Sequence, residues 1–81
     1  MYPLSTYTEI EHLTHLFCMK HDIKMAPHFT NKNTVGSKRY VCKQGRMTAN
    51  YVARDDDIQA HGVDGVVARL IADITWDFDI R

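Results

Sequence analysis

The stretch that decides the fold is residues 63–78, VDGVVARLIADITWDF. At 100° of rotation per residue, its large apolar side chains fall within an arc of roughly 140°, the buried stripe of an amphipathic helix. These side chains are Val63, Val66, Val67, Leu70, Ile71, Ile74 and Phe78. Arg69 and Trp76 fall outside the arc. The pattern therefore predicts a helix that lies on a core.

The last residues of the chain fit two conformations. From Ile74 to Ile80, apolar and polar side chains alternate, which is a period typical of a strand. The helix either ends near Trp76 and leaves an extended tail, or continues and exposes Trp76. A third interpretation places the indole at the end of the core. The sequence leaves these alternatives open.

The amino-terminal part of the chain predicts another helix. Thr6-Tyr7-Thr8-Glu9 matches the capping box, in which a Thr and a Glu side chain bond the first free amides of a helix. Ile10, Leu13 and Phe17 then recur at helical spacing. We expect a helix at residues 7–21.

The central part of the chain predicts three strands. Residues 24–30 fit an edge strand because Pro27 interrupts them, and residues 31–37 are rich in turn formers. Residues 38–43 and 46–54 flank Gln44-Gly45, which predicts a β-hairpin.

The acidic run after the hairpin predicts the start of the last helical region. Asp55, Asp56 and Asp57 end the third strand and are candidate helix caps. His61-Gly62 indicates a kink before the main helix. The predicted order is therefore α-β-β-β-α, in a single domain over residues 1–81. We expect an α+β fold, a three-stranded antiparallel sheet with both helices packed on one face.

This order of elements resembles that of the double-stranded-RNA-binding domain. In that family a lysine-rich start of the second helix grips phosphates, and a Gly-Pro-x-His loop reaches the groove. The corresponding residues 63–68 here contain no lysine and include Asp64, and residues 31–38 lack the loop motif. The resemblance thus implies the order of elements and not the binding of duplex RNA.

The net charge of zero conceals three charged segments. Residues 23–54 carry seven Lys and Arg and no acidic residue, whereas residues 55–81 carry seven Asp against two Arg. Residues 1–22 are slightly acidic. Segregated charge affects which partners a protein attracts rather than how the chain folds. It predicts a charge-segregated surface, with separate basic and acidic regions.

Nothing in the motif content predicts an enzyme, a cofactor or a metal site. His12, His15, Cys18 and His21 recur every third residue, but each such step turns about 60° backwards, so the four cannot share one ion. The four glycines are scattered and form no phosphate-binding loop. The sequence shows neither a secretory signal nor an apolar run long enough for a bilayer, so we expect a cytoplasmic protein that does not bind membranes.

Two sets of residues are candidate contact surfaces. The first set, for a protein partner, contains Trp76, Asp73, Asp77 and Asp79, because an aromatic outside the core is a candidate interface anchor. On the extended interpretation, this carboxyl-terminal segment would add as a strand to a partner or form a homodimer. The second set, for nucleic acid or an acidic partner, contains Lys38, Arg39, Lys43 and Arg46.

The favoured interpretation is a small non-enzymatic regulator or inhibitor that contacts a larger host or cognate protein or nucleoprotein complex. Small phage-encoded accessory proteins that inhibit host factors have this general character, which is an analogy of size and composition. The alternative is a nucleic-acid-binding module that uses the basic hairpin 38–54. A small metal- or thiol-dependent enzyme is the third interpretation.

Overall fold

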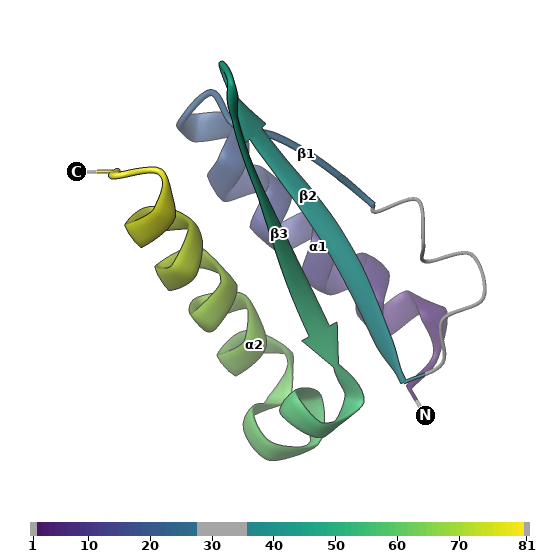
Figure 1. The fold of residues 1–81 in the computed structure, drawn as a ribbon. Helices are drawn as coiled ribbons and strands as arrows, with labels where there is room; N and C mark the ends of the chain where they lie inside the picture. Colours follow the sequence, from purple (N-terminus) through teal and green to yellow (C-terminus); the bar gives the residue numbers. More distant parts are fainter. Residues whose placement is uncertain (1, 28–35, 81) are drawn as a thin grey trace.

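The order of elements in the computed structural model is the one predicted, over the residues it describes, 2–27 and 36–80. The elements are α1 (Leu4–Lys20), β1 (Lys24–Pro27), β2 (Ser37–Gln44), β3 (Met47–Arg54) and α2 (Asp55–Asp77) (Figure 1). Residues 28–30 of the predicted first strand and residues 31–35 of the predicted loop 31–37 lie outside the described part, and Ser37 of that loop belongs to β2. The α+β fold class is confirmed.

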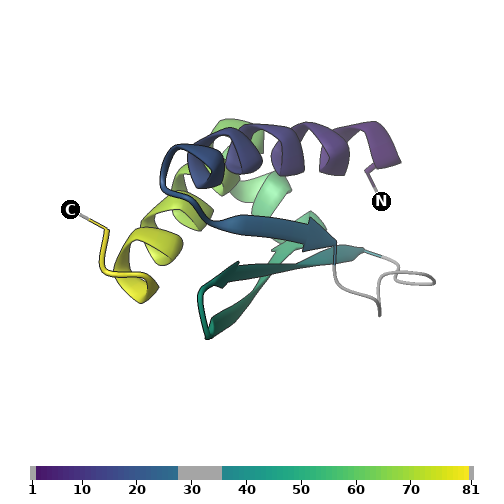
Figure 2. The same cartoon turned by 90° about the horizontal axis from the view of Figure 1, so that it is seen from above.

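The sheet is antiparallel in the order β1-β2-β3, so β2 is the central strand. Tyr40 on β2 pairs with Tyr51 on β3, and Cys42 pairs with Met25 on β1. Figure 2 shows α1 and α2 on the same side of the sheet, whose other face carries no helix. The predicted two-layer packing is therefore present, and it leaves one sheet face open.

The core lies between the sheet and the two helices. Tyr40, Ile10, Ile74, Thr14, Cys18 and Cys42 are its largest fully buried side chains. The hydroxyl of Tyr40 donates a hydrogen bond to the backbone oxygen of Tyr7, at 3.1 Å, which joins β2 to α1. The thiols of Cys18 and Cys42 also hydrogen-bond, and this contact together with burial raises the pKa of Cys42.

The first helix begins at Leu4 rather than at the predicted Tyr7. Its N-cap is Pro3, which has an extended backbone, and no side chain caps the helix. The predicted capping box of Thr6 and Glu9 is therefore wrong. The fixed φ of proline favours the start of a helix, and the amide of Thr6 already bonds the Pro3 oxygen at 3.0 Å. The first turn thus forms before the predicted cap.

The predicted kink in the last helical region is confirmed at Gly62. This residue has φ 70° and ψ 174°, a backbone conformation that is essentially restricted to glycine. The kink separates a short first segment, which begins with the three aspartates, from the long second segment. Asp55, Asp56 and Asp57 occupy the first turn, where carboxylates are favoured by the helix dipole, and Arg54 is the N-cap.

Both helices end in the same hydrogen-bonded motif. After α1, the amide of Ile23 bonds the Cys18 oxygen and the amide of Asp22 bonds the Met19 oxygen. After α2, the amides of Ile80 and Asp79 make the equivalent bonds. This is the Schellman motif, which requires a left-handed residue, and Asp22 and Asp79 supply it with φ 57° and 51°.

We expect Asp22→Gly to raise the free energy of unfolding by about 0.5–1 kcal/mol, because glycine adopts positive φ without steric cost. Removal of a negative charge from the helix carboxyl end acts in the same direction. Urea denaturation measures the change. The control, Asp56→Gly in the first turn of α2, should destabilise the protein, and the interpretation fails if both variants shift in the same direction.

Candidate protein-binding surface

The second helix presents Asp73, Trp76 and Asp77 on one side. The indole of Trp76 is 86% exposed, although its neighbours Ile74 and Phe78 are buried. Since 100° separates successive helical residues, the three side chains fall within about 100° of arc. The structure thus brings these three predicted site residues together, while Asp79 follows the end of the helix.

The extended interpretation of the carboxyl terminus is wrong. Trp76 and Asp77 lie within α2, and the Schellman motif closes the helix after them. Ile74, Phe78 and Trp76 decide this outcome together. A strand would place all three side chains on one face, whereas a helix buries Ile74 and Phe78 and leaves Trp76 exposed, as the structure shows. Strand addition or a homodimer through an extended carboxyl-terminal segment is therefore not supported. The interpretation that buries Trp76 at the end of the core is also wrong.

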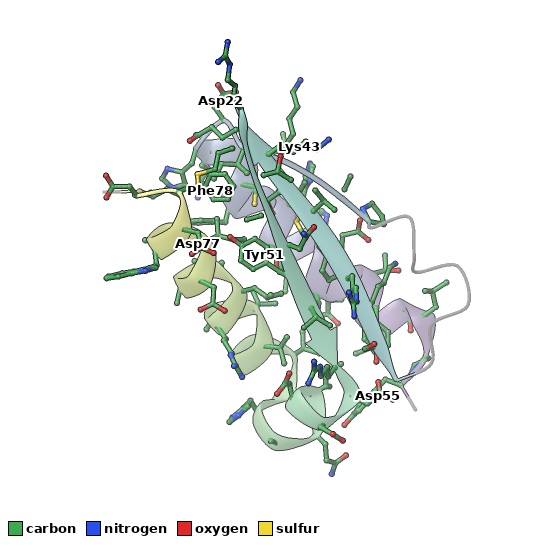
Figure 3. The ribbon with its side chains drawn as sticks, in the orientation of Figure 1. Asp22, Lys43, Tyr51, Asp55, Asp77 and Phe78 are labelled. Carbon is green, nitrogen blue, oxygen red and sulfur yellow. The ribbon has the colours of Figure 1, made fainter. Side chains whose placement is uncertain are left out.

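A hydrogen bond between β3 and α2 fixes the acidic end of this surface. The Tyr51 hydroxyl donates to Oδ2 of Asp77 at 2.8 Å, and Figure 3 shows the two side chains pointing toward one another. Burial raises the pKa of Tyr51, and the Asp77 contact raises it further. The aspartate is thereby held in place beside Trp76.

A groove of about 320 Å³ lies between β3 and α2. Asn50, Val52 and Arg54 line it from the strand, and Arg69, Leu70 and Asp73 line it from the helix. Arg54, Arg69 and Asp57 lie toward the start of α2, and Asp73 lies one helical turn beyond Arg69 in the direction of Asp77.

The ion pair inside this groove is weak. Nη1 of Arg69 lies 3.6 Å from Oδ1 of Asp57, and the Arg69 side chain is 66% exposed. Exposed pairs of this kind contribute about 0–1 kcal/mol. Arg69 is therefore available for a stronger interaction with an external carboxylate.

The structure divides the predicted basic set. Arg39 and Lys43 share the open face of β2, whereas Lys38 lies on the helix-covered face and its ammonium is 3.7 Å from Glu11. Arg46 lies in the hairpin turn. Alternation along one strand separates neighbours to opposite faces, so consecutive cations do not form one surface.

The register adds two cations to the open face. Lys24 on β1 pairs with Lys43, and Arg54 on β3 shares this face at the far edge. The outward positions of the three described strands contain no acidic residue. The open face is therefore cationic, in contrast to the acidic end of α2.

Comparison with known proteins gives no family for this chain. No family model, no curated protein and no solved structure matches it. The surface is therefore interpreted from its own geometry. Across residues 2–27 and 36–80, no three His, Cys, Asp or Glu side chains are grouped so that they could hold a metal ion. No helix in the same part of the chain is both long and apolar enough to cross a bilayer.

Sequence reasoning did not identify the strand side of the groove. Asn50, Val52 and Arg54 form a wall because β3 is an edge strand beside α2, which depends on the sheet order. Arg69 stood outside the apolar arc of α2, and this was the one available signal for the helix side. This signal does not show on its own which two elements adjoin.

Proposed function

We propose that this chain is a small non-enzymatic protein that binds a larger protein through Trp76, Asp73 and Asp77, and thereby regulates or inhibits it. The observation that carries the proposal is the 86% exposure of Trp76 on a helix anchored by Ile74 and Phe78. Exposed tryptophans on rigid elements are the side chains that contribute most to binding energy at protein interfaces. Such an anchor loses little conformational entropy when it binds.

The flanking carboxylates define the chemistry of the partner. Asp73 and Asp77 lie on either side of Trp76 along the helix, and Asp79 adds a further negative charge after it. A partner surface with an apolar pocket rimmed by Lys or Arg would fit this arrangement. Opposite charges at the rim would steer association and set specificity, while the indole would supply most of the affinity. We also propose a cytoplasmic location, where the buried thiols would stay reduced.

The test combines capture of a partner with measured affinity. Affinity purification from cells that express the chain identifies a candidate partner. Isothermal titration calorimetry then measures the affinity of the purified partner for the wild-type chain and for each variant. We expect Trp76→Ala to weaken binding about 30-fold or more, which corresponds to a loss of about 2 kcal/mol.

Met19→Ala is the matched control, because Met19 is 63% exposed on α1 and should leave affinity unchanged. Equal losses from both variants, or no loss from Trp76→Ala, would overturn the proposal.

A second candidate function is the binding of single-stranded nucleic acid by the open sheet face. The strand register supports this function, because it places four cations and two polar side chains on this face. The cations are Lys24, Arg39, Lys43 and Arg54, and the polar side chains are Thr48 and Asn50. Binding of this kind weakens steeply with salt because bound counterions are released. Retention on immobilised oligonucleotide at rising salt, lost in Lys24→Glu/Lys43→Glu but kept in Trp76→Ala, would favour this function over the first.

A further inference from the structure

The open face of the sheet has an apolar centre. Ala26 on β1 pairs with Val41 on β2, and Val41 pairs in turn with Asn50 on β3. Val52 lies two residues beyond Asn50, so it shares their face and is a diagonal neighbour of Val41, opposite the helices in Figure 2. A hollow of about 200 Å³ lies at Val52, and its lining also includes Arg39, Asn50 and Tyr51. The face therefore offers an apolar area with a recess beside it.

Cations surround this apolar centre, and none of the outward residues described on β1, β2 and β3 is acidic. Lys24 and Lys43 are paired directly across β1 and β2. Like charges in this position repel one another, so an external carboxylate placed near both ammonium groups would relieve the repulsion. Arg39 lines the hollow itself, and a guanidinium is attracted to the face of an aromatic ring, most strongly that of tryptophan. The face is therefore complementary to an indole accompanied by carboxylates.

We propose that the open sheet face of one chain binds the Trp76 side of α2 of a second copy of the chain. The indole, which is 86% exposed, enters the hollow at Val52 and stacks on Arg39. The carboxylates beside the indole then meet the cations of the face.

Charge complementarity identifies a second copy as the occupant. Along α2, Asp73 precedes Trp76, and Asp77 and Asp79 follow it, so negative charge lies on both sides of the indole. Positive charge likewise lies on both sides of the hollow. Arg54 is two residues from Val52 along β3, and Lys43 is four residues from Arg39 in the opposite direction along β2. The partner inferred for Trp76, an apolar recess rimmed by Lys and Arg, is thus present on the chain itself.

The contact joins two different surfaces, so it is heterologous. Because α2 packs on the opposite side of the sheet from the open face, a chain can use both surfaces at once (Figure 2). Association therefore continues beyond a dimer, into a ring or an open chain of copies. The inference rests on the proposed function, since the Trp76 surface also binds the larger partner. Self-association covers the indole, and the larger partner must compete for it.

Two variants that each lack one surface test the contact. Trp76→Ala removes the indole, and Lys43→Glu reverses a charge on the open face while placing opposite charges across from Lys24. We expect each to weaken self-association about tenfold or more in sedimentation equilibrium, and added salt to weaken that of the wild type. Lys20→Glu reverses an exposed charge on α1 and should associate like the wild type. Circular dichroism confirms that each variant is folded.

Mixing the two variants distinguishes a heterologous contact from a symmetric one. The Lys43→Glu chain keeps the Trp76 surface and the Trp76→Ala chain keeps the open face, so we expect a heterodimer and nothing larger. Trp76 is the single tryptophan, so the emission of the mixture comes from the Lys43→Glu chain alone. We expect this emission to shift to shorter wavelength as the indole leaves water. Titration with the double variant Trp76→Ala/Lys43→Glu, which lacks both surfaces, should give no shift.

A wild-type chain that stays monomeric at about 200 µM, or a Lys43→Glu variant that associates like the wild type, would overturn the proposal. A monomeric chain that retains oligonucleotide through Lys24 and Lys43 would also overturn it, in favour of the second candidate function. Lys43→Glu should not weaken binding of the larger partner, whereas Trp76→Ala should. The failure of this contact and the failure of the proposed function therefore give different results.

Discussion

Ile74→Ala is expected to lower the free energy of unfolding by about 3–4 kcal/mol, the largest effect of any single substitution considered for this protein. Ile74 lies in the second segment of α2 and is a fully buried member of the core between the helices and the sheet. Its truncation removes buried methyl groups and leaves a cavity that close-packed neighbours fill only in part. A domain of this size has only about 5–15 kcal/mol of stability, so much of it would be lost.

Trp76→Ala, two residues further along the same helix, is the matched comparison. Because the indole is 86% exposed, we expect the free energy of unfolding to change by no more than about 0.5 kcal/mol. Urea denaturation followed by circular dichroism measures both variants. Comparable destabilisation by the two substitutions would mean that Trp76 is part of the core in solution, and its loss would then not report on binding.

This contrast matters for the proposed function. Affinity lost in Trp76→Ala is attributable to the contact surface only if the variant is folded. The close spacing of Ile74 and Trp76 in α2 separates the two roles sharply, because one side chain anchors the helix and the other contacts solvent. The exposed tryptophan can therefore be removed without disturbing the element that carries it.

The second large effect is expected at alkaline pH. Burial raises the pKa of Tyr40 above its ordinary value near 10, with a smaller contribution from the negative charge of Glu11. Burial and the bond to Asp77 do the same for Tyr51. In the unfolded chain both phenols ionise near pH 10, whereas the folded state keeps them protonated. The folded state therefore binds more protons, and its stability falls as the pH rises above about 10.

Each such tyrosine contributes a slope of up to about 1.4 kcal/mol per pH unit above pH 10. Urea denaturation at intervals between pH 8 and 11.5 measures the slope, and absorbance near 295 nm follows ionisation of the phenols. Tyr40→Phe and Tyr51→Phe should each reduce the slope by about half, whatever their effect at neutral pH. An unchanged slope in both variants would show that other groups govern alkaline unfolding.

The basic and the acidic regions of the surface lie on different elements. The cations Lys24 and Lys43 lie on the strands, and the carboxylates of Asp73 and Asp77 lie on α2. Lys38–Glu11 is an ion pair that joins the basic and acidic segments within the described structure. The other charges of the two regions can contact partners. The acidic region belongs to the proposed protein-binding site, and the basic region is the alternative site for nucleic acid.

Much of the fold is determined by local sequence pattern. The apolar stripe at 63–78 identifies α2, the glycine after residue 44 identifies the hairpin, and Gly62 identifies the kink. Each signal depends on residues that are neighbours along the chain, whose conformational preferences act before any tertiary contact forms. Together with the helical spacing of Ile10, Leu13 and Phe17 and the predicted edge strand at residues 24–30, these signals give the α-β-β-β-α order.

Tertiary structure decided the conformation of the carboxyl terminus, which sheet face the helices cover and which elements border the groove. Ile74, Trp76 and Phe78 fit both a helix and a strand by spacing. The strand is excluded because Ile74 and Phe78 are buried while Trp76, which would share their face in a strand, is exposed. Alternation shows that Lys38 and Lys43 lie on opposite faces, but which face the helices cover depends on long-range packing. The free edge of β3 and its groove exist because β1 pairs with β2 while α2 lies beside β3. Contacts between residues distant in the chain are not encoded in local periodicity, so these features emerge only when the chain is folded.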